Sequence, residues 1–209
     1  MRARPLGYIS PDGWLSGRNR SAHVGDILRM PRYFAFLRAI NVGGHNVKMQ
    51  RLCSLFEELS FTNVEAFIAS GNLIFETKSR SARTLKKQIE EQLHASLGYE
   101  VATFLRTDKE LIAISKYGPF SDSDLRSASA NCIGFVDEPL SADALKVLNS
   151  LNTDIDRFHF HEREVYWLSR ARQGESTFSN AVLERILKRK STFRGVNTIT
   201  RLAAKYLLR

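Results

Sequence analysis

The stretch VEAFIASGNLIFE, Val64–Glu76, holds two β-type segments on either side of the pair Ser70-Gly71. A serine–glycine pair between two such segments is typical of a tight β-hairpin. The earlier segment YFAFLRAI (33–40) is apolar on both faces apart from Arg38, as expected of a central strand. Together the three segments predict one antiparallel sheet.

Two helical patterns accompany these strands. Apolar residues recur at helical spacing across 49–59 and again across 85–97, and Gly98 follows the second pattern at a C-cap position. A fourth β-type segment, EVATFLR, covers 100–106. The resulting order β-α-β-β-α-β is that of the ferredoxin-like unit, whose two helices cover one face of the sheet.

The second half of the chain repeats this order in part. Residues 131–137 predict a strand, Ser141 predicts a helix cap and 156–170 predict a hairpin. A helical pattern covers 178–186, only the short STFRG (191–195) stands where a fourth strand is due, and an amphipathic helix follows. The sequence therefore predicts an α+β fold with two ferredoxin-like (βαββαβ-type) subdomains, the second modified with a C-terminal helix.

The same patterns divide the chain into four segments. Residues 1–30 contain no periodic element and are expected to be a disordered leader, or to precede a true start at Met30. The first subdomain is predicted over 31–118 and a polar linker over 119–130. The second subdomain, with basic C-terminal helices, is predicted over 131–209.

Composition limits the possible classes of protein. Hydrophobic residues make up 43% and charged residues 25% of the 209 residues, which suits a soluble globular protein with a sizeable core. No apolar run reaches the roughly 18 residues of a membrane helix, so no membrane partner is expected. Cys53 and Cys132 have no partner at metal-ligand spacing, and each is expected to be a buried thiol in a cytoplasmic protein.

The formal net charge of +9 is concentrated near the end of the chain. Residues 176–209 carry eight Lys or Arg against Glu184 alone, a net charge of +7. Such a cluster attracts phosphate-rich partners, so a nucleic-acid-binding protein that uses the basic C-terminal segment is one alternative. A solvated helix face explains the same charges without any partner.

Several segments carry a family resemblance: INVGG (40–44), SGN (70–72), STFSNAVLERIL (176–187) and STFRGVNTITRLAAKY (191–206). On these segments the chain resembles the family catalogued as domain of unknown function 1697, over about residues 30–207. The resemblance implies two ferredoxin-like halves packed together, and it implies no activity. Its motifs fall on Asn41, Gly43 and Gly44, on Ser70, Gly71 and Asn72, and on Arg194, Asn197 and Thr198. Many members have Asn after the arginine of the last motif, where this chain has Gly195.

The paired glycines Gly43 and Gly44 lie between a strand and a helix. In that arrangement, backbone N–H groups and a helix N-terminus can hold an anion, with further contacts from Asn41, Asn46 and Lys48. Neither the dinucleotide-binding fingerprint nor the P-loop pattern is present. The alternative is that both glycines only supply positive φ for a turn.

Two further motifs have both a binding and a structural explanation. Arg194 precedes a helix that Asn197 or Thr198 can cap, so it would clamp a carboxylate or phosphate, or else bridge the two subdomains. Gly71 and Asn72 are ordinary turn residues unless another polar group lies close to them.

Other candidate sites are weaker. His159 and His161 lie on one strand face at a spacing that allows two metal ligands, but no third ligand is evident, so a pair of surface imidazoles is expected and no metal site is predicted. Neither a Gly-x-Ser-x-Gly elbow nor a His-Glu-x-x-His motif is present. Phe34 and Phe36 share a strand face, but the strand motif of RNA-recognition domains is missing, so this face is expected to pack against the other subdomain.

The sequence thus favours a protein that binds an anionic small ligand, a phosphate or carboxylate, in a cleft between the subdomains. Alternatives are a nucleic-acid-binding protein, an enzyme of unknown reaction in which Lys48, Arg194 or His45 takes acid–base or oxyanion roles, and a pure interaction module. No cofactor and no oligomeric state are indicated. The expected ligand-binding residues are Asn41, Gly43, Gly44, Lys48, Ser70, Gly71, Asn72, Arg194, Asn197 and Thr198.

Overall fold

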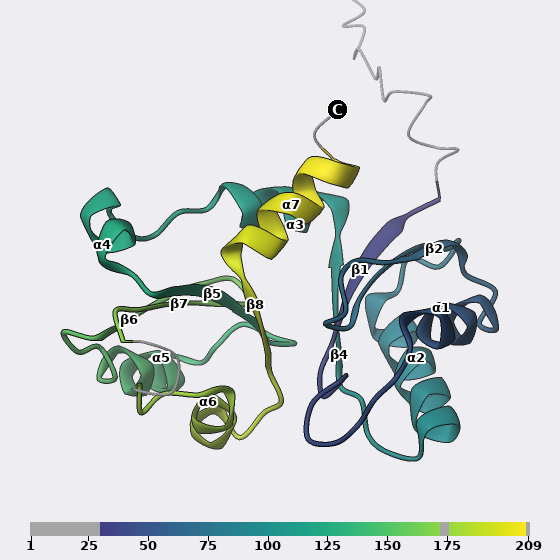
Figure 1. The fold of residues 1–209 in the computed structure, drawn as a ribbon, viewed down its shortest axis with the longest axis horizontal. Coiled ribbons are helices and arrows are strands. Elements are labelled where there is room, and N and C mark those ends of the chain that lie inside the picture. Colours follow the sequence, from purple (N-terminus) through teal and green to yellow (C-terminus); the bar gives the residue numbers. More distant parts are fainter. Residues whose placement is uncertain (1–29, 172–175, 208–209) are drawn as a thin grey trace, which may run out of the picture.

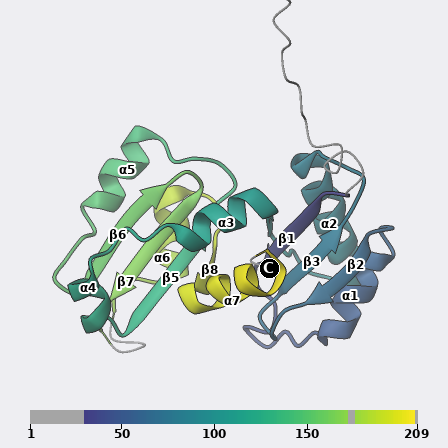
Figure 2. The ribbon, with the colours of Figure 1, turned by 90° about the horizontal axis from the view of Figure 1, so that it is seen from above.

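The computed structural model describes residues 30–171 and 176–207, so nearly all of the predicted leader lies outside the described residues. Two four-stranded antiparallel sheets lie side by side (Figures 1 and 2). The first subdomain consists of β1 (Arg32–Leu37), α1 (Met49–Glu57), β2 (Thr62–Ala66), β3 (Asn72–Glu76), α2 (Ala82–Leu97) and β4 (Thr103–Thr107).

The strand order of the first sheet is β2-β3-β1-β4, and α1 and α2 cover one of its faces (Figure 1), which confirms the ferredoxin-like prediction. The side chain of Ser81 caps α2 by accepting a hydrogen bond from the N–H of Thr84. Gly98 ends the helix in the left-handed conformation, with φ 79°, as its C-cap position predicts.

Strand β1 separates two hydrophobic cores, because successive side chains on a strand point to opposite faces. Tyr33, Ala35 and Leu37 belong to the core beneath α1 and α2. Phe34 and Phe36 belong to a second core on the other face of the sheet. All five side chains are buried, so β1 is a central strand, as predicted.

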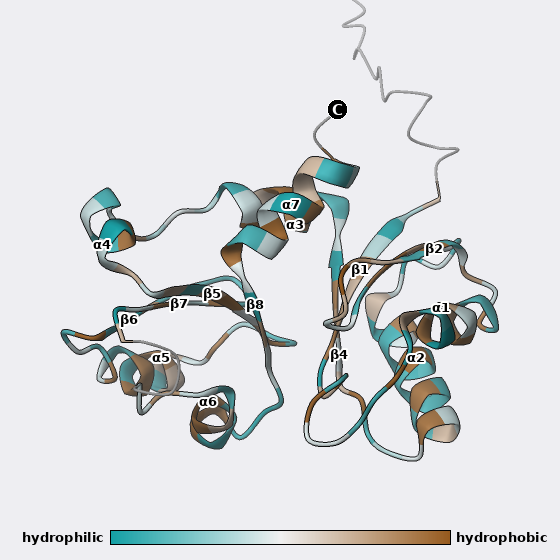
Figure 3. Ribbon diagram, in the orientation of Figure 1, coloured by the Kyte–Doolittle hydropathy of each residue, from teal (hydrophilic) through white to brown (hydrophobic). Residues whose placement is uncertain are grey.

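The second subdomain consists of β5 (Ala130–Phe135), α5 (Ala142–Asn149), β6 (Asp156–His161), β7 (Glu164–Ser169), α6 (Asn180–Leu187) and β8 (Thr192–Gly195). Its strand order, β6-β7-β5-β8, repeats that of the first sheet. The short STFRG segment therefore supplies a true fourth strand, which pairs with β5. Much of α6 is hydrophobic (Figure 3), and its Leu183 is buried in the core beneath α5 and α6.

Each subdomain continues into a helix after its fourth strand. Helix α3 (Asp108–Lys116) follows β4, and α7 (Val196–Tyr206) follows β8. The two helices lie in contact above the junction of the sheets (Figures 1 and 2). The C-terminal helix, predicted as a peculiarity of the second subdomain, thus has a counterpart in the first. A short helix, α4 (Asp122–Ser127), lies within the segment predicted as a linker.

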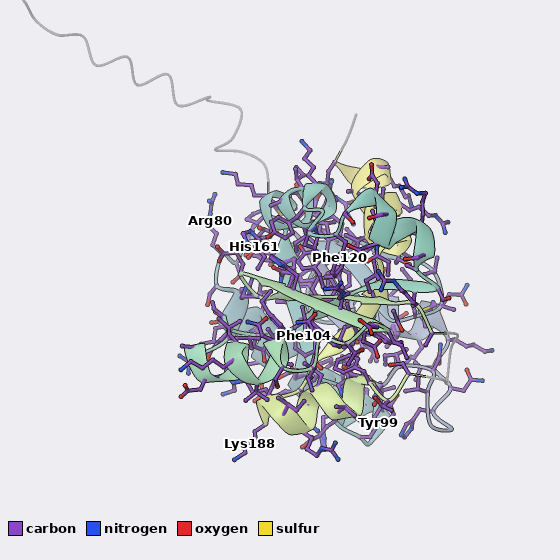
Figure 4. All side chains as sticks on the ribbon, turned by 90° about the vertical axis from the view of Figure 1, so that its left-hand side faces the viewer. Arg80, Tyr99, Phe104, Phe120, His161 and Lys188 are labelled. Carbon is purple, nitrogen blue, oxygen red and sulfur yellow. The ribbon has the colours of Figure 1, made fainter. Side chains whose placement is uncertain are left out.

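The sheets pack against each other through an aromatic core. The rings of Phe36 and Phe135 stack with their centroids 4.1 Å apart. Phe104, labelled inside the molecule in Figure 4, is fully buried in the same core. The predicted packing of the Phe34 and Phe36 face against the second subdomain is confirmed. Since this face is buried, it is not available to stack nucleic acid bases.

Strand register shows that the subdomains are equivalent position by position. Arg106 on β4 pairs with the residue two before Phe36, and Arg194 on β8 pairs with the residue two before Phe135. Phe36 pairs in turn with the first residue of β3, and Phe135 with the first residue of β7. An approximate twofold relation, centred on the Phe36–Phe135 stack, therefore exchanges the two halves.

Cys53 and Cys132 are half-buried rather than fully buried, and burial raises the pKa of both thiols. Cys53 packs against the core beneath α1 and α2. Across residues 30–171 and 176–207, none of the helices has the length and apolar character that crossing a membrane requires.

Candidate functional site

Arg194 joins the end of β8 to the first subdomain. Its Nε donates to Oδ1 of Asn72, and its Nη2 donates to the carbonyl oxygens of Leu37, at 2.8 Å, and Gly71, at 3.4 Å. Two of the three predicted segments, Ser70–Asn72 and the one around Arg194, therefore meet.

The remaining donors of Arg194 are also used within the protein. Nη1 donates to Oγ1 of Thr192, at 2.8 Å, and to the carbonyl oxygen of Phe193, at 2.7 Å. A guanidinium has five N–H groups, so no donor is left for a ligand. This geometry supports the structural alternative, an arginine that bridges the subdomains.

Burial lowers the pKa of Arg194 to about 10, so the side chain is still charged at neutral pH. Its five acceptors are all neutral: carbonyl oxygens, an amide oxygen and a hydroxyl. The side chain has no carboxylate partner among the described residues. Arg194 therefore leaves an uncompensated positive charge beside the end of β1.

The Ser70–Asn72 motif shapes the turn between β2 and β3. The Asn72 amide donates to the carbonyl oxygen of Phe67, at 3.1 Å, and to Oγ of Ser70, at 2.8 Å. A Cβ added at Gly71 would lie 3.0 Å from Cβ of Ile40, and φ of Gly71 is +68°. The motif is thus explained by turn geometry and close packing, the alternative considered from the sequence.

The diglycine loop is exposed and only partly tied to the other motifs. Asn41 donates to the carbonyl oxygen of Ala69, at 3.3 Å, and accepts from the N–H of Val47, at 2.7 Å. Gly43 and Gly44 have φ of +62° and +88°, and a Cβ on either would meet nothing within 4 Å. The loop therefore needs these glycines for their backbone conformation and not for close approach.

The residues at the starts of α7 and α1 were also predicted site residues. The N-cap of α7 is Gly195, with no side-chain hydrogen bond, so the predicted capping by Asn197 or Thr198 is wrong. The helix begins at Val196, which puts both side chains inside its first turn. Lys48 is the exposed N-cap of α1 and makes no side-chain cap hydrogen bond.

A cleft of about 840 Å³ lies between the subdomains, but none of the predicted site residues lines it. It opens between α2 and the segments that follow β1 and β5 and precede β4 and β8. Its lining residues are Arg38, Lys86, Glu90, Glu91, His94, Ala95, Glu100, Val101, Ala102, Asp137, Glu138, Arg189 and Lys190. The cleft is lined by side chains of both signs of charge, and it is not formed by the three motifs from which the sequence predicted a cleft.

A residue after each of the strands β1 and β5 forms an ion pair with a helix of the other subdomain. Arg38, directly after β1, makes a two-pronged pair with Glu184 of α6, at 2.6 and 2.7 Å. Asp137, the equivalent residue after β5, pairs with Lys86 of α2 at 2.5 Å. Arg38 and Asp137 are thus equivalent residues of opposite charge, but their partners are not equivalent, because α6 has Asn180 at the position of Lys86.

The two equivalent carboxylates of this region titrate differently. Glu90 accepts the N–H of Thr103, at 2.8 Å, but desolvation prevails and raises the pKa of Glu90. Glu184 accepts the N–H of Ser191, at 2.7 Å. Burial also acts to raise its pKa, but the hydrogen bonds and charge of Arg38 prevail and lower the pKa of Glu184.

One corner of the cleft has an excess of positive charge. Arg38 and the backbone of Ser191 bind the same carboxylate, Glu184, so Lys190 lies next to Arg38. Arg194 donates to the carbonyl oxygen of Leu37, the residue before Arg38. Within the described part of the chain, no carboxylate forms a salt bridge with the exposed Lys190. Among the described residues, these three cations therefore have one carboxylate partner, Glu184.

Tyr117 contacts both histidines of β6, His159 and His161. The Tyr117 hydroxyl is hydrogen-bonded to Nε2 of His159, at 2.7 Å, and its ring stacks on His161 at 4.1 Å. Desolvation, with a contribution from His161, lowers the pKa of His159. In the described ranges, no group of three or more His, Cys, Asp or Glu is placed to hold a metal ion.

The cleft residues had a weak signal in the sequence. Arg38 was the only charge in an apolar strand, and Lys86, Glu90 and His94 recur at the spacing of one helix face. A solvated helix has the same spacing, however, so the pattern alone does not indicate a cleft.

Comparison with known proteins supports the fold. The solved structure titled "conserved bacterial protein SP0830 from Streptococcus pneumoniae" is similar, with a TM-score of 0.67 and 23% identity, over 84% of this chain and 98% of that chain. No curated protein matches the sequence. Residues 30–166, well over half of the chain, match the family described as "Protein of unknown function (DUF1697)". The chain therefore belongs to the DUF1697 family.

Proposed function

We propose that the protein binds a small anionic ligand, through a phosphate or carboxylate group, in the cleft between its subdomains. Ligand sites in proteins usually occupy about 300–1,000 Å³ and often lie between domains. The cleft, at about 840 Å³, falls in this range and receives residues from both subdomains.

The observation that carries the proposal is the charge imbalance around Arg38, Lys190 and Arg194, for which Glu184 is the single carboxylate partner among the described residues. Arg194 offers no hydrogen bond to a ligand, but its charge is buried and acts through surroundings of low dielectric constant. The exposed Lys190 is free to contact an anion directly. Nearby, Arg189 forms an exposed ion pair with Glu138 at 3.5 Å. Such a surface pair is weak, so a ligand anion can take the place of Glu138.

The nucleic-acid alternative has less support. Among the described basic residues of the C-terminal segment, those at 185–190 lie on or directly after α6, and Arg201 and Lys205 lie on α7, on the opposite side of the second sheet (Figure 1). Arg194 is buried, and Lys205 pairs with Glu65 at 2.9 Å. A single continuous basic footprint is therefore not formed by these residues.

Calorimetric titration of the full chain with inorganic phosphate and with citrate, at constant ionic strength, tests the proposal. We expect saturable binding of at least one anion, weakened at least tenfold by Lys190→Glu and abolished by Ala95→Trp, which fills the cleft. Lys146→Glu, a charge reversal at an exposed site on α5, should leave binding unchanged. Absence of binding, or equal loss in the control variant, would contradict the proposal.

A further inference from the structure

A run of cations lies at the start of α2. Between Thr77 and Gln88 the chain has five cations and no carboxylate: Lys78, Arg80, Arg83, Lys86 and Lys87. Positive charges near a helix N-terminus oppose the helix dipole and repel one another. The arrangement is therefore unfavourable for the isolated protein.

Only part of this charge is compensated within the protein. Lys86 pairs with Asp137 and, at 3.6 Å, with Glu90, and Lys87 lies 3.7 Å from Glu91. Lys78, Arg80 and Arg83 are exposed. No salt bridge joins these three to any carboxylate of the described ranges, and Figure 4 shows Arg80 extending away from the molecule.

The fold itself does not require these cations. Helix α6 is the equivalent of α2, since Glu184 and Glu90 accept equivalent backbone N–H groups. At the positions of Lys86 and Lys87, α6 has Asn180 and Ala181. Helix α2 also begins a turn earlier than α6, and that additional turn carries Arg83.

Arg83 lies on the side of α2 that lines the cleft. Lys86, Glu90 and His94 form the cleft wall, and Arg83 precedes Lys86 by three residues, so it occupies the same helix face. It extends the wall by about 4.5 Å along the helix axis. The end of the helix is not itself the site, because Ser81 already accepts the N–H of Thr84.

We propose, on the basis of the proposed function, that the cleft ligand is a compound with two or more phosphate groups. One phosphate lies at the corner formed by Arg38 and Lys190, and another is bound by Arg80 and Arg83 at the start of α2. Guanidinium groups match phosphate oxygens in two-pronged geometry, so this end favours phosphate over a single carboxylate. The cleft wall from Lys86 to Ala95 runs about 14 Å along α2, a length that suits a nucleoside polyphosphate or an organic bisphosphate.

The test compares inorganic tripolyphosphate with orthophosphate by calorimetry on the full chain at constant ionic strength. We expect tripolyphosphate to bind the unmodified protein at least tenfold more tightly. The double variant Arg80→Ser with Arg83→Ser should lose most of that advantage and keep orthophosphate affinity within about twofold. The matched control, Arg126→Ser with Lys146→Ser, removes two exposed cations elsewhere and should change neither affinity.

The outcomes separate this inference from the proposed function. Equal affinities for the two anions, or a tripolyphosphate advantage that survives the double variant, overturn the inference alone if Ala95→Trp still abolishes orthophosphate binding. Absence of binding by either anion overturns both. Tighter binding of a single-stranded oligonucleotide than of tripolyphosphate, lost in the same double variant, overturns the inference in favour of a nucleic acid surface. Unchanged circular dichroism establishes that each variant is folded.

Discussion

Arg106 and Arg194 occupy equivalent positions on β4 and β8, and each reaches across to the other subdomain. Arg106 donates to the carbonyl oxygens of Leu105, Val136 and Arg163, and Arg194 to those of Phe193, Leu37 and Gly71, the equivalent residues. The partner of Nε differs. It is the carboxylate of Glu164 for Arg106, at 2.6 Å, and the amide of Asn72 for Arg194.

This difference separates a structural from an electrostatic role. The Arg106–Glu164 pair is neutral and almost fully buried, with side-chain exposures of 1% and 4%. Arg194 makes the same kind of network without a carboxylate, and it lies beside Arg38, which lines the cleft. The same scaffold therefore yields one neutral contact and one that keeps a net positive charge at the cleft.

The largest expected effect comes from removing each arginine in turn. Arg106→Met leaves the buried Glu164 without a cationic partner, with only the N–H of Arg163 still donating to it, and we expect a loss of about 3–5 kcal/mol in the free energy of unfolding. Arg194→Met leaves only neutral acceptors unpaired and removes an uncompensated buried charge, so we expect a loss of about 1–3 kcal/mol. Urea denaturation measures both, and an equal or larger loss for Arg194→Met would contradict the distinction.

The glycines near Arg194 provide the next test. Gly71→Ala places a Cβ 3.0 Å from Ile40 in a left-handed conformation, so we expect a loss of about 2–3 kcal/mol. Gly43→Ala meets no neighbour and suffers only the backbone strain, about 1 kcal/mol. Thermal denaturation followed by circular dichroism checks the order, and equal losses would mean that close packing at Gly71 is unimportant.

The equivalent carboxylates Glu90 and Glu184 should respond oppositely to pH. The folded-state pKa of Glu184 is lowered, so its contribution to stability is present above its unfolded value of about 4.3 and is lost as pH falls through the folded pKa. We expect Glu184→Gln to destabilise the protein by about 1–2 kcal/mol at pH 7 and to destabilise it less near pH 3.

For Glu90 the folded-state pKa is raised, so any stabilising contribution is present below about pH 4.3 and is lost as pH rises through the folded pKa. Glu90→Gln should therefore be neutral or slightly stabilising at pH 7, within about 0.5 kcal/mol. Denaturation at both pH values compares the two variants. Destabilisation by both at pH 7 would show that the two environments do not differ as described.

A small effect on stability is also expected from Asn72→Asp, which gives Arg194 the carboxylate that Arg106 already has. The new ion pair offsets the amide donations to Phe67 and Ser70 that are lost, so we expect a change below about 1 kcal/mol. Anion affinity should fall severalfold, because the net charge beside the cleft is neutralised. Asn72→Ser is the control, since it loses the amide without adding charge. An equal fall in affinity for both variants would refute the electrostatic role.

The fold could be predicted from the sequence because its signals are local. The period of apolar residues located the strands and helices, and Ser141 and Gly98 were correctly assigned as caps. The sequence did not clearly predict β8 as a strand, because it has only four residues. Its pairing also depends on β5, more than fifty residues away in the chain. The equivalence of α3 and α7 depends on register, which a helical pattern does not reveal.

The site was harder to predict because its determinants are not local. Arg194 was singled out, but its acceptors are largely backbone carbonyl oxygens, which have no signature in the sequence. The diglycine loop resembled an anion site because positive φ serves turns and anion binding equally. The cleft wall consists of charged residues on α2 that pattern alone does not distinguish from a solvated surface.

The most direct test of the central claim is an NMR titration of the uniformly ¹⁵N-labelled full chain with inorganic phosphate at constant ionic strength. The account predicts saturable amide shifts that cluster at Arg38, Ala102 and Lys190, around the cleft. Shifts confined to Gly43 and Gly44, or no saturable shifts at all, would contradict it.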